Sequence, residues 1–355
     1  MRKATLLKRE LKKLKVDGLL ITDMLNVRYI SGFSGSAGYA IITPGDSIFV
    51  TDFRYQEQSD REVRDFSIYI ERSERSRDIK DLCEKMGIKK LAFEDHNVSY
   101  GFYMKLLRKK IRLKPVTGVI ESQREKKTPE ELTFIKKAVR RAEISFKRLQ
   151  NFIKPGITEQ GLAVRLEGFL KEEGCASLPF EVIVASGPMS ALPHARPTNR
   201  TLKKGDLVVI DWGGECNGYY SDMTRTVLLK GRDMSRQREI YATVLDAQRK
   251  AVNAVIAGIK ASKIDGAARD YIGKKGFGEF FGHGTGHGVG LAVHERPYVS
   301  WKSKDLIKEN MVFTKEPGIY IPGLGGVRIE DMVVAREKGV EILNKLPKKL
   351  KIIER

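Results

Sequence analysis

The hydrophobic positions in the first third of the chain alternate between a helical spacing and short apolar runs. An amphipathic helix is predicted near the N-terminus, with one apolar face formed by Leu6, Leu7, Leu11 and Leu14. Strands are predicted at GLLIT, at YAIIT and GDSIFVT on either side of a Pro-Gly-Asp turn, and at IKKLAFE, which follows a helical stretch around RDIKDLCEKMG. The segment NVRYISGFSGSAG is interpreted as a Gly/Ser loop. Helices between strands indicate an α/β domain, which we place at residues 1–122.

A second segment begins with a strong helix start at residues 128–131, TPEE, which combines a capping hydroxyl, a proline in the first turn and early acids. Helical spacing continues to Leu149, and another helix is expected over residues 158–170. Strands are predicted at EVIVAS, DLVVIDWG, YYSDMTRTVLL, MVFTKEPGIYI and GVRIEDMVVA, with a long helix near 236–257. The chain is too long for one ordinary core, so residues 123–355 are expected to form a second domain.

Composition fits soluble, globular domains. Of the 355 residues 41% are hydrophobic and 31% are charged, and no run approaches the roughly 20 apolar residues that cross a bilayer. The basic N-terminus lacks the apolar core and small-residue cleavage site of a signal peptide. Three cysteines without regular spacing argue against a disulfide framework and for buried, reduced thiols, so a cytoplasmic location is expected.

The formal net charge of +20 is the one unusual bulk property. Such a charge could indicate binding to nucleic acid or to another acidic partner. The 65 Lys and Arg residues are spread along the whole chain among the acids, however, and no run has the aromatic residues of a single-strand binder. A solvated basic surface explains the charge better, and nucleic acid is not expected as a partner.

Four carboxylates occupy positions where strands would bring them together. Asp211 ends the apolar run LVVI, and Asp222 begins the next strand after the turn-rich GGECNGYYS. A hairpin of that length returns the chain beside itself and can bring both carboxylates to one place. Glu316 and Glu330 repeat the arrangement, because FTKEP and GVRIED are predicted as strands joined by IYIPGLGG, with each glutamate within an apolar strand.

Burying four carboxylates in β-structure is costly unless positive charge lies among them. Four of the five histidines fall in the same part of the chain, among glycines, prolines or short polar residues. Carboxylate oxygens with an imidazole nitrogen suit manganese, cobalt, iron or zinc. A pair of such ions can polarise a carbonyl group and activate water for hydrolysis. The pattern therefore predicts two divalent metal ions, with manganese expected first and cobalt, zinc or iron as alternatives.

The second segment contains four motifs in this order: SGPMSALPHARPTNR, LVVIDWGGECNGYYSDMTRT, GHGTGHGVGLAVHE and TKEPGIYIPGLGGVRIED. In them the segment resembles the creatinase/methionine-aminopeptidase superfamily, and within it the Xaa-Pro peptidases, aminopeptidase P and prolidase. The first segment, with NVRYISGFSGS and TDFRY, resembles the creatinase-type N-terminal domain. The resemblance implies an α/β N-terminal domain followed by an α+β pita-bread catalytic domain, acting on peptides with proline in the second position.

The resemblance also implies the residues of the site. Its metal ligands would be Asp211, Asp222, His287, Glu316 and Glu330. Its catalytic residues would be Glu316, His194, His294, His283, Arg328 and Tyr320. The glutamate would be the general base, two of the histidines would contact substrate and steady the intermediate, and His283 would line the proline pocket. The guanidinium of Arg328 would hold a ligand carboxylate by paired hydrogen bonds.

Two positions depart from the usual pattern of the family. Met189 stands where relatives commonly have asparagine, and Lys315 stands where an apolar residue usually precedes the ligand glutamate. Strand alternation points Lys315 away from the side that Glu316 faces, so Lys315 is expected at the surface or at an interface. Elsewhere, His96 in EDHNVS is interpreted as a surface loop residue and Trp212 as core packing.

The resemblance leaves the preferred substrate open. Aminopeptidase P acts on longer peptides and prolidase on dipeptides, and the loop GFSGSAG with the word TDFRY favours aminopeptidase P. Creatinase and the catalytically silent binding proteins of this fold are disfavoured, because they lose ligand carboxylates that this chain keeps. Methionine aminopeptidase is disfavoured because it generally lacks the N-terminal domain and the ALPHARP motif. The family also implies a homodimer, in which the loop at residues 31–38 could reach the neighbouring site.

Overall fold

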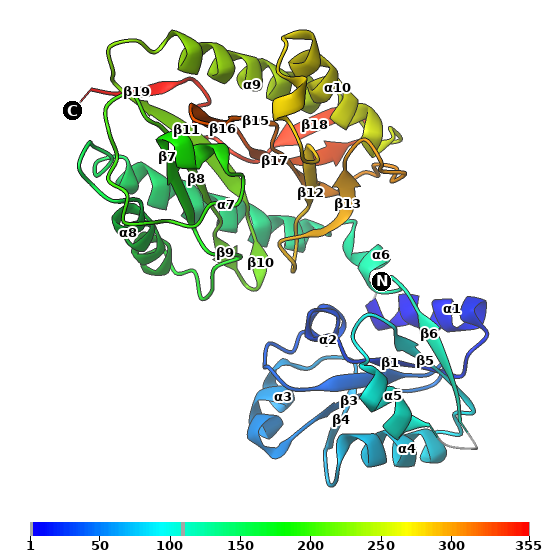
Figure 1. Ribbon diagram of the computed structural model, residues 1–355. Helices are drawn as coiled ribbons and strands as arrows, with labels where there is room; N and C mark the ends of the chain where they lie inside the picture. The colour runs from blue at the N-terminus through cyan, green and yellow to red at the C-terminus, as the bar shows by residue number, and fades with distance from the viewer. Residues whose placement is uncertain (1–2, 108–110, 355) are drawn as a thin grey trace. The chain divides into compact units, whose positions relative to one another are not determined.

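The computed structural model describes residues 3–107 and 111–354 and divides into two compact units, the first ending at Arg124 and the second beginning at Glu125 (Figure 1). Within these ranges, no helix combines the length and the apolar character needed to span a lipid bilayer. The three cysteines are buried and free of disulfide bonds, in agreement with their expected role as small apolar side chains.

The first unit is built on a six-stranded mixed sheet with strand order β4-β3-β2-β1-β5-β6. Its strands are β1 (Gly18–Ile21), β2 (Tyr39–Ile42), β3 (Ser47–Thr51), β4 (Ser67–Ile70), β5 (Lys90–Glu94) and β6 (Arg112–Val116). Its helices are α1 (Lys3–Leu14), α2 (Met24–Ser31), η1 (Phe53–Tyr55), α3 (Gln56–Glu62), α4 (Arg75–Lys85), α5 (Tyr100–Leu106) and α6 (Glu121–Arg124). Leu20 and Leu91 of the sheet pack with α4 and α5, and α1 buries Leu7 and Leu11 of its predicted apolar face.

The prediction of a Gly/Ser loop over NVRYISGFSGSAG is wrong for the first half of this segment, which forms α2. The carboxylate of Asp23 begins this helix by accepting hydrogen bonds from the backbone N–H groups of Leu25 and Asn26. Gly32, with a φ of 83°, ends the helix in the left-handed conformation that glycine adopts without strain. The loop therefore begins only after α2, and the strands predicted on either side of it are confirmed.

The second unit has four long helices among its described residues. They are α7 (Pro129–Leu149), α8 (Glu159–Glu172), α9 (Ser235–Asn253) and α10 (Ala261–Lys274), with the short helices η2 (Gly187–Ala191) and η3 (Gly278–Phe280) in loops. As predicted, Thr128 begins α7 through a capping box with Glu131, and Thr158 caps α8. Helix α10 was not predicted, because Gly266 and Gly273 weaken its helical pattern.

Two sheets form the centre of the second unit. The four-stranded sheet has the order β19-β11-β8-β7 and the five-stranded sheet has the order β13-β12-β14-β17-β18. Their strands are β7 (Ile183–Ser186), β8 (Leu207–Trp212), β11 (Met223–Leu229), β12 (Gly286–Gly288), β13 (Glu295–Val299), β14 (Val312–Lys315), β17 (Asp331–Arg336), β18 (Gly339–Ile342) and β19 (Lys351–Ile353). Short hairpins pair β9 (Glu215–Cys216) with β10 (Tyr219–Tyr220), and β15 (Gly318–Ile321) with β16 (Gly325–Arg328).

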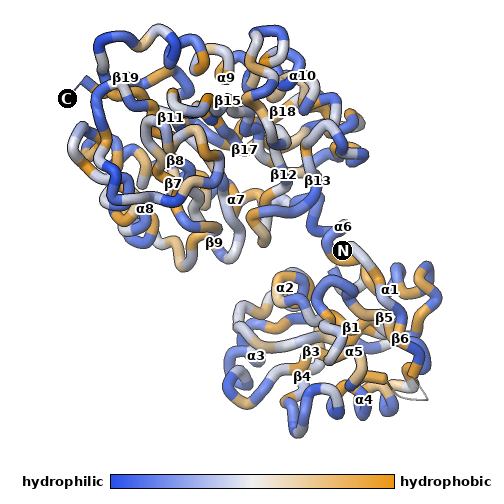
Figure 2. Tube along the Cα trace, viewed as in Figure 1, coloured by the Kyte–Doolittle hydropathy of each residue, from blue (hydrophilic) through white to orange (hydrophobic). Residues whose placement is uncertain are grey.

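Helices pack in pairs against these sheets, α9 beside α10 and α7 beside α8 (Figure 1). Val244 of α9 and Ile264 of α10 belong to the same buried cluster as Phe313 of β14. On the other helix pair, the ring of Trp212 stacks on Phe146 of α7 with centroids 4.4 Å apart, which confirms its expected role in the core. Figure 2 shows the resulting pattern, with much of the hydrophobic colour along the strands and alternating colours along the helices.

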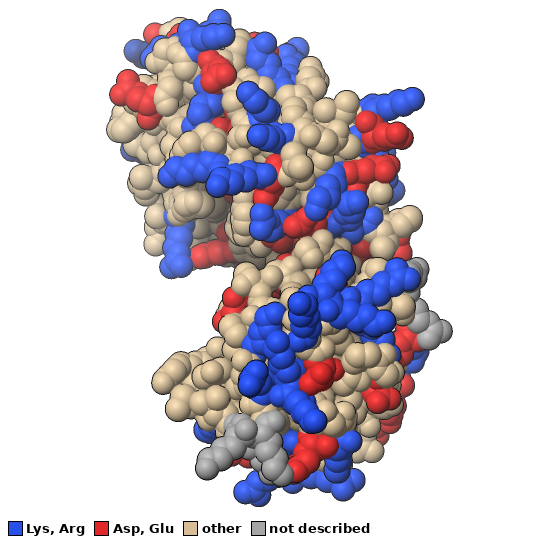
Figure 3. All heavy atoms as spheres, turned by 90° about the vertical axis from the view of Figure 1, so that its right-hand side faces the viewer, with Lys and Arg blue, Asp and Glu red and all other residues tan. Residues whose placement is uncertain are grey.

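Basic side chains are distributed over both units. In the face seen in Figure 3, Lys and Arg occur on both units, gathered most densely on the first unit and elsewhere mixed with Asp and Glu. Several of them form exposed ion pairs, such as Lys105 with Glu74 at 2.9 Å and Arg236 with Glu239 at 2.7 Å. This arrangement is that of a solvated charged surface.

Candidate metal centre

Strands β8 and β11 bring Asp211 and Asp222 to one face of the four-stranded sheet. Asp211 lies opposite Thr224 in the antiparallel ladder, and Asp222 comes two residues before Thr224. Because side chains alternate along a strand, residues 222 and 224 point to the same face as Asp211. The two aspartates are therefore diagonal neighbours, as the hairpin pattern predicts, although Asp222 immediately precedes β11 rather than beginning it.

Glu316 and Glu330 approach each other in the five-stranded sheet. Lys315 of β14 pairs with Asp331 of β17, so each glutamate stands one residue beyond this last pair. The expectation that both glutamates lie within strands is wrong, since Glu316 follows β14 and Glu330 lies between β16 and β17. The backbone N–H of Glu330 instead donates to the carbonyl oxygen of Thr224 at 3.1 Å. This bond ties Glu330 to β11, the strand that follows Asp222.

His287 of β12 faces the carboxylates. Its Nε2 lies 3.5 Å from Oδ2 of Asp222 and 3.4 Å from Oε1 of Glu316. Ligand atoms of Asp222, His287 and Glu330 all lie within 4.8 Å of one another. The other ring nitrogen, Nδ1, lies 3.1 Å from the carbonyl oxygen of Gly288, to which it donates in the neutral ring. The lone pair of Nε2 therefore points at two carboxylate oxygens, which is favourable only with a cation between them.

The charges of this cluster are not balanced by its protein surroundings. Burial, followed by the charges of Asp211 and Glu316, raises the pKa of Asp222 well above its usual range. Burial and the charges of Asp222 and Glu316 likewise raise the pKa of Glu330. Burial lowers the pKa of His287 to about 4, so its ring is neutral at neutral pH. A divalent cation would compensate the charges of the two carboxylates, and the neutral imidazole offers it a lone pair.

Asp211 provides a further test of the fit to a metal. Its Oδ2 accepts a hydrogen bond from Arg328 at 2.7 Å, whereas its Oδ1 is buried and has no hydrogen-bond partner among the described residues. A buried carboxylate oxygen without a partner is costly. This oxygen, the neutral imidazole and three further carboxylates make a donor set that fits divalent metal ions of the manganese-to-zinc class.

Arg328 connects the aspartates to the glutamates. Besides Asp211, it donates to the hydroxyl of Tyr320 at 3.0 Å and to Oγ1 of Thr224 at 3.0 Å, and this threonine donates to Oε2 of Glu330 at 2.7 Å. Thr224 was missed by the sequence analysis. The signal that could have found it is its position two residues after Asp222 on a strand, because that spacing puts both side chains on one face.

Thr314 is a second residue that was missed, and it stands two residues before Glu316. Its hydroxyl donates to Oε1 of Glu316 at 3.1 Å and accepts from the backbone N–H of His287 at 3.2 Å. Thr314 thus orients the carboxylate of Glu316 and holds the backbone of His287.

The predicted histidines surround a cavity of about 610 Å³ that contains the carboxylate cluster. The predicted site residues in its wall are Asp211, Asp222, His194, His283, His287, His294, Glu316, Arg328 and Glu330. Tyr320 lies behind the wall, where its hydroxyl is 2.9 Å from Nε2 of His283. The rings of His287 and His294 lie with their centroids 4.1 Å apart. The structure therefore gathers every predicted site residue around one cavity.

Comparison with known families accounts for both units. Residues 133–337 match metallopeptidase family M24, and residues 4–126 match the creatinase/prolidase N-terminal domain. The chain belongs to metallopeptidase family M24. The unit that holds the carboxylate cluster is the one that matches the peptidase, and the predicted superfamily is confirmed.

Relatives of this M24 protein match it over nearly its whole length. The Xaa-Pro dipeptidase of Pyrococcus horikoshii is 38% identical over 343 residues, which cover 95% of each protein. The structure of the Xaa-Pro dipeptidase from Bacillus anthracis has a TM-score of 0.96 at 37% identity and covers 99% of both chains. The X-Pro aminopeptidase structure from Thermotoga maritima has a TM-score of 0.90 at 34% identity, covering 96% of this chain and 99% of that one. The predicted fold class and the assignment to Xaa-Pro metallopeptidases are confirmed.

The structure corrects the expectation for Lys315, which is fully buried rather than exposed. Its Nζ donates to the carbonyl oxygen of Thr314 at 2.8 Å and lies 4.2 Å from the centre of the Phe313 ring. Burial lowers the pKa of Lys315 well below its usual range. Strand alternation predicts that Lys315 points to the face of β14 opposite Glu316. That face is not exposed, because it packs in the core that also buries Phe313.

We expect the substitution Lys315→Met to stabilise this M24 peptidase by about 1–3 kcal/mol, because methionine keeps the apolar stem and removes a buried ammonium group. Thermal unfolding of the metal-loaded protein measures the effect. The substitution Lys308→Met, at an exposed position, serves as the control and should change stability by less than about 0.5 kcal/mol. A lower melting temperature for Lys315→Met would mean instead that Lys315 balances the nearby charges of Glu316 and Asp265.

The loop that carries His283 is held by two charged residues of α10. The carboxylate of Asp265 accepts two hydrogen bonds from Arg269, at 2.7 and 3.0 Å, and two from Thr285, at 2.7 and 3.1 Å. Arg269 in turn donates to the carbonyl oxygens of Phe281, at 2.9 Å, and His283, at 2.6 Å. This pair therefore sets the position of one wall of the cavity.

We expect Arg269→Lys to lower kcat/KM on Xaa-Pro peptides about ten-fold, mostly through KM, because lysine cannot keep both the paired bonds to Asp265 and the two carbonyl bonds. Steady-state kinetics and metal content measure the two aspects, and the metal content should not change. The control Arg249→Lys, in an exposed pair with Asp246 on α9, should leave both unchanged. Loss of metal in Arg269→Lys would contradict a role confined to the loop of His283.

Proposed function

We propose that this chain is an Xaa-Pro aminopeptidase that uses two divalent metal ions, manganese in the first instance, to hydrolyse the peptide bond before a proline in the second position. The proposed metal ligands are Asp211, Asp222, His287, Glu316 and Glu330. The proposed catalytic residues are Glu316, His194, His283, His294, Arg328 and Tyr320. The observation that carries the proposal is the buried group of carboxylates that faces the neutral Nε2 of His287 and includes the unpartnered Oδ1 of Asp211.

The roles of the protein groups follow from their positions. When bound, the ions would polarise the scissile carbonyl group and activate the attacking water. Glu316, whose carboxylate is oriented by Thr314, accepts a proton from that water and passes it to the departing proline nitrogen. His194 and His294 are the more exposed histidines of the cavity wall, and they donate hydrogen bonds to the oxygen that becomes negative. Arg328 keeps Asp211 in place.

Recognition of proline requires shape more than hydrogen bonds, because proline lacks a backbone N–H and its ring fixes φ. Phe180, Val182 and Pro193 line the same cavity as His283 and provide apolar wall for the ring. Burial lowers the pKa of His283, and its ring is held by the carbonyl oxygen of Gly284 at 2.7 Å. A neutral, fixed imidazole beside apolar side chains suits an uncharged five-membered ring.

Among the described residues that line the cavity, no arginine is both rigid and uncommitted, and this favours an aminopeptidase over a dipeptidase. A dipeptide ends in a free carboxylate, and a site selective for dipeptides needs a fixed cation to bind it. The described residues that line the cavity include two arginines, Arg196 and Arg328. Arg328 is buried and donates to Asp211 and to other protein groups, so it is engaged. The side chain of Arg196 is 84% exposed and pairs with Glu181 at 3.3 Å, so it offers no rigid carboxylate site.

Xaa-Pro dipeptidase is the second candidate, because relatives of that name match nearly the whole chain. Release of alanine from Ala-Pro-Ala and from Ala-Pro, after chelation and addition of Mn²⁺, separates the two. Metal-dependent cleavage of the tripeptide supports the aminopeptidase, and cleavage of the dipeptide alone supports the dipeptidase. The variant Arg196→Ala should leave tripeptide cleavage unchanged. No cleavage of either peptide with Mn²⁺, Co²⁺, Zn²⁺ or Fe²⁺ would contradict the proposed function.

We further propose that the peptidase is a homodimer in a reducing compartment. In the first unit Phe53 is 81% exposed and Tyr100 is 76% exposed, and large exposed aromatic side chains are typical of subunit interfaces. The three free, buried cysteines suit a compartment without oxidative disulfide formation. Light scattering after size exclusion should give twice the 40.1 kDa of one chain, and a monomer mass at micromolar concentration would contradict the dimer.

A further inference from the structure

The first unit holds a cluster of metal-binding side chains of its own. Asp23 follows β1, His96 follows β5, and Glu121 lies in α6, which follows β6. Because β5 runs parallel to both β1 and β6, the carboxyl ends of three neighbouring strands meet at this edge of the sheet. From β1 the strand order continues to β2 in one direction and to β5 in the other. Ligands of open α/β sheets bind at such a point, where the strand order reverses direction.

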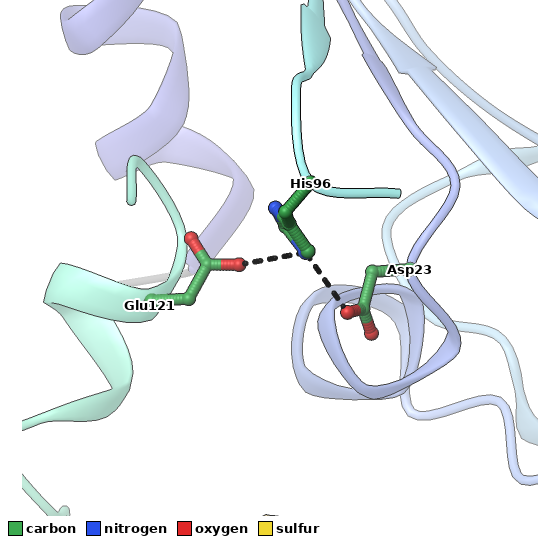
Figure 4. Close-up of side chains that lie close together, drawn as sticks. All are labelled: Asp23, His96 and Glu121. Carbon is green, nitrogen blue, oxygen red and sulfur yellow. Dashed lines mark hydrogen bonds and ion pairs between the residues drawn. The ribbon is translucent and has the colours of Figure 1, made fainter. Parts of the chain in front are cut away.

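Three possible ligand atoms point toward one another at this edge (Figure 4). Nε2 of His96 lies 3.1 Å from Oδ2 of Asp23 and 3.6 Å from Oε1 of Glu121, and one ligand atom of each residue lies within 4.8 Å of those of the other two. The donors of a tetrahedral zinc ion, with bonds of about 2.0–2.2 Å, stand about 3.3–3.6 Å apart. The two separations measured from His96 are close to this range, so small side-chain movements suffice to accept an ion.

Both carboxylates are held in place by neighbouring groups. Oδ1 of Asp23 accepts from the backbone N–H groups of Leu25, at 2.7 Å, and Asn26, at 3.3 Å, which leaves Oδ2 directed at His96. The side-chain amide of Asn26 donates to Oε1 of Glu121 and to Oε1 of Glu94, at 2.6 Å in the latter case. The bond from Asn26 orients the carboxylate of Glu121, and its Oε1 keeps one of its two lone pairs for an ion.

The cluster is negative although the whole chain carries a charge of +20. Glu94, which is buried, and Asp95 add two carboxylates to those of Asp23 and Glu121. Together these four carboxylates give this edge of the sheet a negative potential, which attracts a cation.

We propose that Asp23, His96 and Glu121 bind a divalent first-row transition-metal ion, with Zn²⁺ the best match to one imidazole and two carboxylates. The side chain of His96 is 43% exposed, so an ion can enter and water can complete its coordination. The ion would join α6, the last helix of the first unit, to the start of α2 and the end of β5. It would be a structural ion of the first unit, additional to the two proposed for catalysis.

Equilibrium dialysis of the full-length chain against Zn²⁺, followed by elemental analysis, tests the proposal. The variant His96→Gln should bind one equivalent of Zn²⁺ fewer than the unaltered chain. Asp23→Asn should bind the extra ion at least ten-fold more weakly, while the asparagine keeps the cap of α2. The control is Asp46→Asn, an exposed aspartate of the same unit outside the cluster, which should lose nothing. Circular dichroism verifies that the variants are folded.

An equal zinc content in His96→Gln and the unaltered chain would overturn the proposal and leave His96 as a protonated partner of the two carboxylates. An equal loss in Asp23→Asn and Asp46→Asn would overturn it as well, because general electrostatic attraction would then explain the binding. If His96→Gln failed to fold, Asp23→Asn would decide the question. A difference of one equivalent is readable whether or not the chain cleaves peptides, so this test is independent of the proposed function.

Discussion

Replacing Glu316 by glutamine should lower kcat on Xaa-Pro peptides by about 10²–10⁴-fold, which corresponds to about 3–5 kcal/mol in the activation barrier. Glutamine has nearly the same shape and can still accept the hydrogen bond from Thr314, so the cavity should keep its form. It cannot accept a proton from water, and as a neutral ligand it weakens the metal site. Steady-state kinetics at saturating Mn²⁺ and the metal content of the protein separate these two contributions.

The matched control for this prediction is Glu309→Gln, at an exposed position shortly before β14, which should leave kcat and metal content unchanged. A full metal complement with kcat reduced as expected would assign the loss to proton transfer. Unchanged kcat at a full metal complement would contradict the role of Glu316 as general base, and a different base would have to be sought among the groups in the cavity wall.

Removal of metal should make the stability of the peptidase strongly dependent on pH. The pKa values of Asp222 and Glu330 are raised by burial and by neighbouring carboxylates, so in the metal-free fold these groups hold protons that the unfolded chain has already lost. The metal-free protein therefore loses stability as the pH rises above the ordinary carboxylate pKa of about 4. We expect a melting temperature that falls between pH 5 and pH 8 after chelation.

Added Mn²⁺ should reverse this loss, and its effect should be larger at pH 8 than at pH 5, because a metal ion binds carboxylates that have released their protons. At a hundred-fold excess over the dissociation constant, one bound ion stabilises by about 2.7 kcal/mol, which is about 4 °C for a chain of 355 residues. Scanning calorimetry across the pH range measures both effects. The double variant Asp222→Asn/Glu330→Gln should show neither, and a metal effect that is equal at both pH values would contradict the argument.

Much of the candidate site was predictable because strand pairing follows from local pattern. The apolar run before Asp211 and the turn-rich segments between the acidic residues indicate hairpins. In a hairpin, alternate residues of the two paired strands lie on one face of the sheet. The register of β8 with β11 bears this out for the two aspartates, whereas the two glutamates lie just beyond the ladder of β14 with β17. The roles of the histidines came instead from the resemblance to a family, since no spacing in the chain would single out His283 from His294.

Other features depend on tertiary contacts that a linear pattern does not contain. Lys315 points to the face opposite Glu316, but only the packed structure shows that helices cover that face. Helix α2 depends on the cap supplied by Asp23, which outweighs the glycine and serine content of the following residues. Thr224 acquires its place because it meets Arg328 and Glu330 from another sheet. None of these three features can be recognised from the residue alone in the sequence.

The pairing of β14 with β17 has a practical consequence for protein engineering. The separation of Glu316 and Glu330 is determined by the ladder that ends at Lys315 and Asp331, not by the number of residues in the hairpin between them. Extra residues at the exposed tip of that hairpin, residues 322–323, would lengthen the chain without shifting either glutamate. One residue inserted within β17 would shift its register, so that the following side chains of the strand would point to the opposite face of the sheet. A fluorescent or affinity label is therefore best inserted at the tip, outside the strand register that positions the two glutamates.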